Sequence, residues 1–236
     1  MKTALCMSND GLVGRTYLEG FLRHNMKPNA VLLLGDQPEP LNELYYERTR
    51  GRWNPPSLKS LMHDLDLSAH FIKKLNDETT VDLIQRLDLD IVIQGNIGII
   101  KEILLKAPKL GFLNIHPGSL PEYRGCSAPE WAIYNNDPVY ATAHLIDSGI
   151  DTGPIICMDK MDIKPSWDYF DFRSNVYLHC ANVMVKALRI ISLSDGNISK
   201  ILTYQNPESG SSRSPMTDPE KIKIVHAYFK NNNQKL

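Results

Sequence analysis

Two patterns of hydrophobic positions alternate along this chain. Short apolar runs bounded by Gly, Asn or Asp are typical of buried strands, and longer segments with apolar residues three or four positions apart predict helices. The predicted strands comprise residues 2–8, 30–34, 69–72, 90–94, 111–116, 139–147 and 154–159. The predicted helices comprise residues 12–24, 41–50, 57–64, 77–87, 99–107, 128–135, 167–193 and 219–229.

The order of these elements predicts the fold class. Strands and helices alternate up to about residue 116, which is typical of an α/β protein with a Rossmann-like, mostly parallel twisted sheet and helices on both faces. A chain of 236 residues suits one domain of ordinary size with a small appendage. We expect the domain to comprise residues 1–200 and a short C-terminal extension to comprise residues 201–236.

Composition and charge narrow the class of protein. With 42% apolar and 22% charged residues, and no uninterrupted apolar run long enough to cross a bilayer, the chain is expected to be globular and not a membrane protein. The N-terminus lacks the basic lead and cleavage site of a signal peptide, so we expect a cytoplasmic protein. A net charge of −1 provides no general attraction for a phosphate backbone, and no nucleic-acid partner is expected.

The four cysteines lie far apart, at Cys6, Cys126, Cys157 and Cys180. None of the short spacings that hold zinc or form a redox disulfide occurs among them. We therefore expect reduced thiols and no metal site.

The candidate chemistry lies at the end of the predicted strand 111–116. The two-residue period of a strand directs Asn114 and His116 to the same side of the sheet, and a loop rich in Pro and Gly follows at the edge where α/β proteins usually bind ligands. Amide and imidazolium N–H groups suit the negative charge that builds on oxygen when an amine attacks an acyl or formyl carbon. Asp151 is the natural carboxylate to orient the imidazole and favour its protonated form.

An Asn-x-His pair taken alone also fits a structural role, because polar pairs at strand ends often satisfy loop backbone. The chain has no Gly-x-Ser-x-Gly elbow, no phosphate-binding Gly-x-x-x-x-Gly-Lys-Ser/Thr loop and no His-Glu-x-x-His helix. If the pair is catalytic, the pattern favours direct transfer between two bound substrates.

Four motifs in sequence order resemble the core signature of a known family. They are Asn114-Ile115-His116-Pro117, Leu120-Pro121-Glu122-Tyr123-Arg124-Gly125, Ala128-Pro129-Glu130-Trp131-Ala132-Ile133 and Asp151-Thr152-Gly153-Pro154-Ile155-Ile156. The family comprises formyltransferases that use 10-formyltetrahydrofolate, including the methionyl-tRNA, glycinamide ribonucleotide and sugar-nucleotide enzymes. The resemblance is strong from about residue 80 to 160 and fades after about residue 200.

The resemblance implies site residues and a formyl donor. It implies that Asn114, His116 and Asp151 are catalytic and that residues 1–200 form the catalytic domain. It also implies that 10-formyltetrahydrofolate is the donor, with its pterin ring held between two segments, largely by backbone groups that glycines allow to approach closely. These segments comprise Gln94, Gly95, Asn96, Ile97, Gly98 and Ile99, and Asp147, Ser148, Gly149 and Ile150. One departure is Gly118, where the tRNA and ribonucleotide enzymes usually carry Ser.

The acceptor follows by elimination. The chain ends before the further C-terminal domain of methionyl-tRNA enzymes, and residues 7–14 match poorly the Gly/Ser/Asn-rich phosphate loop of glycinamide ribonucleotide enzymes. We therefore expect a primary amine on a small metabolite, a nucleotide-linked amino sugar, with a glycinamide-ribonucleotide-type or other small amine as the alternative. The candidate substrate-binding residues are Trp53, Gly118, Ser119, Tyr123 and Arg124.

Several readings of individual residues stay open at this point. Trp53, beside two prolines, is a candidate for stacking on a nucleotide base, and Arg124 fits either a bound phosphate or its own loop backbone. His144 is expected to be a core histidine rather than a second acid or base, and Trp131 is expected to pack in a helix.

Two other functions compete with formyl transfer to an amine. A formyltetrahydrofolate hydrolase would use water in place of the amine, but similar hydrolases carry an extra N-terminal domain and Met1 here directly precedes the first strand. A non-catalytic folate- or nucleotide-binding module would have lost a member of the catalytic set, whereas all three are present. Similar enzymes are commonly homodimers, and we expect one here.

Overall fold

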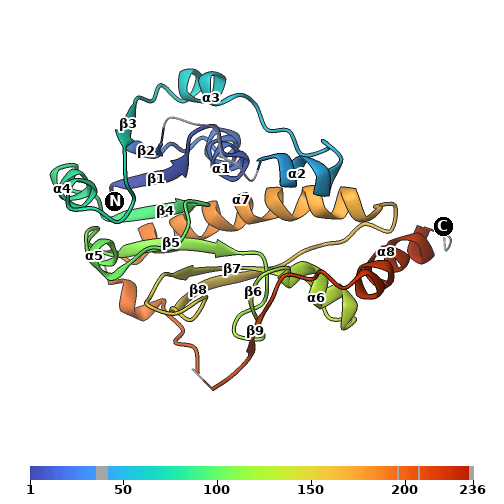
Figure 1. The fold of residues 1–236 in the computed structure, drawn as a ribbon. Coiled ribbons are helices and arrows are strands. Elements are labelled where there is room, and N and C mark those ends of the chain that lie inside the picture. The colour runs from blue at the N-terminus through green and yellow to red at the C-terminus, as the bar shows by residue number, and fades with distance from the viewer. Residues whose placement is uncertain (36–41, 196, 207, 234–236) are drawn as a thin grey trace.

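A seven-stranded sheet in the order β3-β2-β1-β4-β5-β7-β8 forms the centre of the molecule. The computed structural model describes residues 1–35, 42–195, 197–206 and 208–233. The first five strands in this order, β3, β2, β1, β4 and β5, are parallel to one another, β7 is antiparallel to β5, and β8 is antiparallel to β7 (Figure 1). The predicted mostly parallel α/β sheet is confirmed. Its strands are β1 (Thr3–Ser8), β2 (Ala30–Leu34), β3 (Ala69–Ile72), β4 (Ile91–Gly95), β5 (Gly111–His116), β7 (Tyr140–Leu145) and β8 (Ile155–Lys160).

Helices cover both faces of this sheet, because its central strands are apolar on both sides. In β1, Leu5 and Met7 pack into a cluster with α1, α3 and α7, while Ala4 and Cys6 pack on the opposite face with α4 and α5. The helices are α1 (Leu12–Arg23), α2 (Asn42–Thr49), α3 (Leu58–Asp64), α4 (Glu78–Arg86), α5 (Glu102–Leu105), α6 (Ala128–Tyr134), α7 (Tyr169–Leu193) and α8 (Pro219–Asn233), with a 3-10 turn η1 (Ile198–Lys200).

The long helix α7 forms much of the larger core cluster. Asp168 and Asp171 make reciprocal hydrogen bonds with the backbone at its start, so the helix begins two residues later than predicted. By length and composition alone α7 passes as a membrane span, but 56% of its most apolar window is buried inside the protein. Its apolar residues are accounted for by packing against α1, β7 and β8.

Two elements differ from the prediction. Helix α5 is shorter than the predicted 99–107, because Asn96 and Gly98 adopt positive φ and the side chain of Asn76 bonds the backbone of Ile99 and Lys101. A two-stranded parallel sheet, β6 (Tyr123–Gly125) with β9 (Ser211–Arg213), was not predicted, because three-residue strands leave no periodic signal. Leu41, the first residue of one predicted helix, lies outside the described residues.

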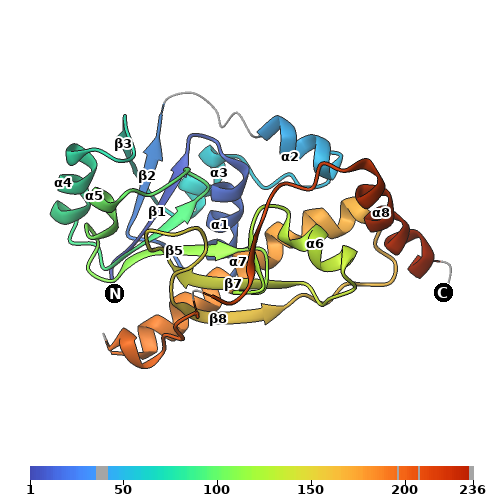
Figure 2. The ribbon, with the colours of Figure 1, turned by 60° about the horizontal axis from the view of Figure 1, so that its bottom comes forward.

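The described part of the C-terminal extension packs on the preceding domain. Beyond the pairing of β9 with β6, Thr203 forms a bridge with Ile155, and α8 lies beside α6 at the end of the molecule far from the N-terminus (Figure 2). Val225 and Phe229 of α8 belong to the larger core cluster. The division at residue 200 stays a prediction.

Candidate active site

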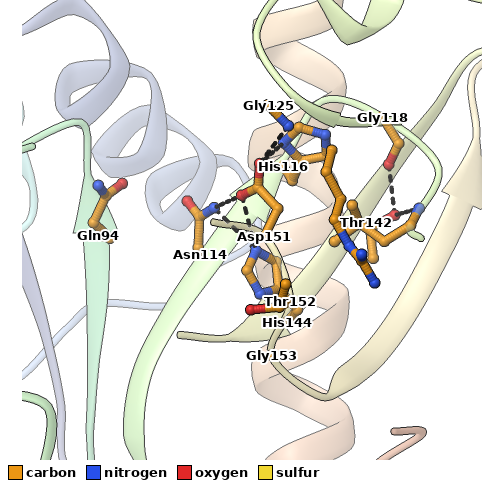
Figure 3. Close-up of polar contacts among 12 residues, drawn as sticks. Gln94, Asn114, His116, Gly118, Gly125, Thr142, His144, Asp151, Thr152 and Gly153 are labelled. Atoms are coloured by element: carbon orange, nitrogen blue, oxygen red, sulfur yellow. Dashed lines mark hydrogen bonds and ion pairs between the residues drawn. The ribbon is translucent and has the colours of Figure 1, made fainter. Parts of the chain in front are cut away.

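Pairing of β5 with β7 brings the polar residues Asn114, His116 and His144 together at the edge of the sheet predicted to bind ligands. The antiparallel register of β5 and β7 places Asn114 opposite His144 and His116 opposite Thr142. The chain then turns after β7 and returns Asp151 to the cluster at a φ of 55° (Figure 3). The turn is held by Asp147, whose carboxylate accepts the backbone N–H of Gly149 at 3.1 Å and the hydroxyl of Thr152 at 2.6 Å.

The Asp151 carboxylate is the centre of this cluster, as Figure 3 shows. Its Oδ2 lies 2.8 Å from the backbone N of Gly125 and 3.3 Å from His116 Nδ1. Its Oδ1 lies 3.5 Å from Asn114 Nδ2 and 3.6 Å from His144 Nε2. The juxtaposition of Asn114, His116 and Asp151 that the catalytic prediction requires is therefore present.

The charge of Asp151 is strongly stabilised. Burial acts to raise the pKa of this carboxyl, but the contacts with His144, His116 and the Gly125 N–H outweigh it and lower the pKa to about 2. Asp151 is thus ionised throughout the neutral range.

His116 is more enclosed than the prediction requires. Its side chain is only 4% exposed, and its Nε2 lies 2.5 Å from the carbonyl oxygen of Tyr123 while Nδ1 faces Asp151. Burial lowers the pKa of His116 by more than the Asp151 charge and the Tyr123 carbonyl raise it. Asp151 does favour the protonated imidazole, as expected, but desolvation is the larger effect and the net shift favours the neutral ring.

His144 belongs to the cluster as well as to the core. It is buried, and its Nδ1 lies 2.9 Å from the carbonyl oxygen of Leu145. Because a carbonyl oxygen can only accept a hydrogen bond, Nδ1 must carry the hydrogen. In the neutral ring Nε2 then accepts the amide N–H of Asn114 at 3.1 Å. The sequence prediction of a satisfied core histidine missed this second contact, which depends on the register between β5 and β7.

Two cavities meet at Asn114. The first cavity, of about 360 Å³, lies among β4, β5, the start of α6 and helices α1, α2 and α7, and the second cavity, of about 200 Å³, lies between the end of β4 and the loop after β7. Gln94 and Asn114 line both. The arrangement can hold two molecules, one on each side of the Asn114 amide.

The second cavity is built from the two segments predicted to hold the folate. Of those ten residues, seven line it, namely Gln94, Gly98, Ile99, Asp147, Ser148, Gly149 and Ile150. Asn96 instead lines the first cavity, and Ile97 is buried in the core against the sheet. Gly95 lies in β4, where an added Cβ would be 2.9 Å from the carbonyl oxygen of Cys6.

Trp53 does not reach either cavity surface. Its ring is stacked on Tyr177 at 3.6 Å, its indole N–H donates to Thr16 at 2.9 Å, and the side chain is 3% exposed. Tyr177 and Thr16 line the first cavity, so Trp53 supports its wall from behind.

The predicted substrate-binding residues of the Pro/Gly loop likewise contact other parts of the protein rather than either cavity. Arg124 is buried and its guanidinium donates to the Gln205 side chain and to the carbonyl of Asn206, so these partners lie in the C-terminal extension and not in its own loop. The Tyr123 hydroxyl donates to Asp137. Gly118 packs so tightly that a Cβ there would lie 2.7 Å from His116 Nε2. Along with Ser119, these residues are not among the described residues that line the two cavities.

The sequence analysis missed the residues that give the first cavity its charge. Arg48 of α2 and Arg173 of α7 both line it. A usable signal was the position of Arg173 within the apolar stripe of α7, since a charged residue on a buried helix face is rare unless it is paired. The described residues contain no group of three or more His, Cys, Asp or Glu side chains placed to hold a metal ion.

Comparison with known proteins places this geometry in context. The sequence model of a family described as "Formyl transferase" matches residues 1–188. Methionyl-tRNA formyltransferase of Deinococcus radiodurans is 34% identical over 89 residues, which are 37% of this chain and 28% of that protein. The enzyme of that name from Finegoldia magna is 30% identical over 119 residues, 50% of this chain and 38% of its own. The chain therefore spans well under half the length of these two curated relatives.

Solved structures share the fold at low sequence identity. The phosphoribosylglycinamide formyltransferase of Anaplasma phagocytophilum aligns with a TM-score of 0.61 and 16% identity over 90% of this chain and 99% of its own. An N-formyltransferase of Helicobacter canadensis, in complex with folinic acid and dTDP-3-aminofucose, aligns with a TM-score of 0.59 and 20% identity over 97% of this chain and 81% of its own. At these identities the likeness shows the fold.

Proposed function

Because this chain belongs to the formyl transferase family, we propose that it is an N-formyltransferase that moves a formyl group from 10-formyltetrahydrofolate to a primary amine of a small metabolite. The observation that carries the proposal is the position of Asn114 at the junction of two cavities, beside the ionised Asp151. A transferase that joins two substrates directly needs both to reach one polar group.

The second cavity fits the folate donor. Gly98 and Gly149 leave room for close approach of a flat ring, and the carboxylates of Asp147 and Asp151 offer acceptors for ring N–H groups. Gln94 and the residues 146–151 would hold the donor. When bound, 10-formyltetrahydrofolate supplies the formyl carbon that the amine attacks.

Asn114 would stabilise the negative charge that develops on the formyl oxygen. One of its amide N–H groups is held by His144 at 3.1 Å. The other makes only a long contact of 3.5 Å with Asp151, which leaves it available to a substrate oxygen in the direction that the His144 contact fixes. A preorganised donor at that position contributes to catalysis because it needs little reorganisation during the reaction.

His116 and Asp151 would handle the proton that the attacking amine must lose. A neutral imidazole is the form that accepts a proton, and burial favours that form in His116. In the neutral ring the Tyr123 carbonyl accepts from an Nε2–H, so the ring must first change tautomer and carry its proton on Nδ1, which faces Asp151. Nε2 can then leave the Tyr123 carbonyl and accept the proton of the amine. Asp151 would then stabilise the positive ring at 3.3 Å, and His116 would hold the proton at Nε2 for return to the departing nitrogen.

For the acceptor we propose a nucleotide-linked amino sugar. The Helicobacter canadensis enzyme, whose complex contains dTDP-3-aminofucose, supports this class. The N-terminus of α1 also argues against a glycinamide-ribonucleotide-type phosphate loop there, because the Leu12 N–H is already bonded to the Asn42 side chain at 3.1 Å. The ribonucleotide-type acceptor is the alternative that the shared fold favours.

A screen with the purified protein tests the proposal. The protein is incubated with 10-formyltetrahydrofolate and a panel of amines that includes nucleotide-linked amino sugars and glycinamide ribonucleotide, and mass spectrometry follows the addition of one carbonyl unit. An arm with the donor alone detects the hydrolase alternative as release of formate. Binding of folate without either product would favour the non-catalytic module.

Two further properties are part of the proposal. We expect a homodimer, which light scattering of the purified protein measures, and a cytoplasmic location, which cell fractionation measures. A monomer at micromolar concentration contradicts the first, and recovery in the membrane or secreted fraction contradicts the second.

A further inference from the structure

The two cavities that meet at Asn114 carry opposite charges. Among the described residues, the acidic and basic side chains that line the first cavity are Arg48 and Arg173, both positive. The second cavity is lined by the two carboxylates of Asp147 and Asp151, both negative, and by the imidazole of His144. Molecules of different charge therefore suit the two sides of the Asn114 amide.

Arg173 is a buried cation with unused donors. Its side chain rises from α7, is 5% exposed, and has one carboxylate partner, Glu130, with Oε1 at 3.3 Å from Nε. Neither Nε nor Nη1 makes a well-aligned hydrogen bond among the described residues, and the nearby Tyr177 hydroxyl is buried without a partner as well. Buried N–H and O–H groups are rarely left unpaired, so these donors point to a ligand with acceptor oxygens.

Arg48 adds a second positive charge at the same wall. It is half-buried on α2, and within the described part of the chain it makes no hydrogen bond or ion pair. Glu130 balances the charge of Arg173, so the charge of Arg48 leaves this region with a net excess of one positive charge. An anion bound between the two guanidinium groups would neutralise that excess.

From this arrangement we infer that the acceptor carries an acidic oxygen group, a phosphate or a carboxylate, bound by Arg48, Arg173 and the Tyr177 hydroxyl while its amine faces Asn114. The inference rests on the proposed function and names its substrate class. Guanidinium forks match both groups by paired N–H···O bonds. The same positive charges disfavour an ammonium ion nearby, and so they favour the neutral amine that attacks the formyl carbon.

Binding of inorganic diphosphate tests the anion site without any activity. Calorimetry compares the wild-type protein with Arg48→Gln and with the control Arg189→Gln, which removes an exposed arginine of α7 that lines neither cavity. We expect saturable binding that Arg48→Gln weakens about tenfold or more and Arg189→Gln leaves unchanged. Absence of binding to the wild type, or equal weakening in both variants, would overturn the inference.

A matched set of acceptors tests the substrate class and separates phosphate from carboxylate. The set comprises one amino sugar, its phosphate ester and its uronic acid. We expect kcat/KM for at least one acidic member to exceed that of the neutral amine about tenfold or more, and we expect Arg48→Gln to remove this preference by raising KM. Equal formylation of all three would overturn the inference and leave the proposed function standing. If the protein binds diphosphate in the calorimetric test but formylates none of the amines, the proposed function is refuted.

Arg173→Lys provides a second variant in case loss of the buried charge prevents folding. It keeps the positive charge beside Glu130 and removes the planar fork. We expect a thermal midpoint near that of the wild type together with weaker binding of diphosphate. Wild-type affinity in a folded Arg173→Lys protein would remove Arg173 from the site.

Discussion

Replacement of Asp151 by Asn removes one charge from the polar cluster while nearly keeping its shape. The Asn side chain can still accept the Gly125 N–H, which lies 2.8 Å from the present carboxylate. It loses the negative charge that faces His116 at 3.3 Å and His144 at 3.6 Å. The variant therefore tests the contribution of the charge rather than that of the packing.

The expected loss of stability follows from the pKa of Asp151. Burial acts to raise this pKa, but the contacts with His144, His116 and the Gly125 N–H lower it from 3.8 to about 2. At about 1.4 kcal/mol per pH unit, a shift of nearly two units corresponds to about 2 kcal/mol of folding free energy. Since the folded-state pKa is the lower one, this stabilisation is present above about pH 4 and is lost as the pH falls through about 2.

Urea unfolding of wild-type and Asp151→Asn proteins at pH 7, 5, 3 and 2 measures the effect. We expect the variant to be less stable by about 2 kcal/mol at pH 7 and most of the difference to be lost at pH 2, where about half of the wild-type carboxyl is protonated. The control, Asp162→Asn, changes an exposed carboxylate and should show no such difference. Once an acceptor is known, kcat/KM of Asp151→Asn should fall about 100-fold or more.

Three results would refute this reasoning. They are equal stability of the two proteins at pH 7, a difference that persists undiminished at pH 2, and unchanged kcat/KM in the variant. The first two would mean that the charge of Asp151 does not stabilise the fold, and the third would remove it from the chemistry.

The remaining predictions concern the neighbours of Asp151. Asn114→Ala should lower kcat/KM about 100- to 1,000-fold in a steady-state assay, since it removes the donor to the formyl oxygen, and near-normal turnover would exclude that role. Gly118→Ala should cost about 1–3 kcal/mol in urea unfolding, because the added Cβ would lie 2.7 Å from both His116 Nε2 and Ala128 Cβ, and wild-type stability would contradict this packing. The lowered pKa of His116 places its protonation below pH 6.5. After correction for ionisation of the acceptor, kcat/KM should therefore be level from pH 7 to 8 and fall at lower pH. A fall in kcat/KM that is already complete at pH 7 would argue against His116 as the proton acceptor.

Much of the fold could be predicted because its information is local. Strands such as β1 and β4 are buried on both faces, so they read as continuous apolar runs, and helices such as α4 show one apolar face. The exceptions have two causes. β6 and β9 are too short for a period, and the start of the predicted helix at 99–107 is held open by hydrogen bonds from Asn76.

The candidate site divides in the same way. That Asn114 and His116 share one side of a strand follows from the two-residue period, and the order of the motifs identified Asp151 as their partner. The register of β5 against β7, which adds His144 to the cluster, is not encoded in either strand alone. The carbonyl of Tyr123 on His116 Nε2 likewise depends on how the following loop folds back.

The sequence by itself determined the α/β class, the places of most strands and helices, and the shared side of Asn114 and His116, because each depends on neighbours a few positions away. Asp151 was identified by the order of the motifs. Only the tertiary structure decided that Trp53 supports a cavity wall, that Arg124 bonds to Gln205 of the C-terminal extension, and that Arg48 and Arg173 from two distant helices face one cavity. Burial, hydrogen-bond partners and local charge arise from contacts between residues far apart in the chain. These contacts exist only once the core has packed.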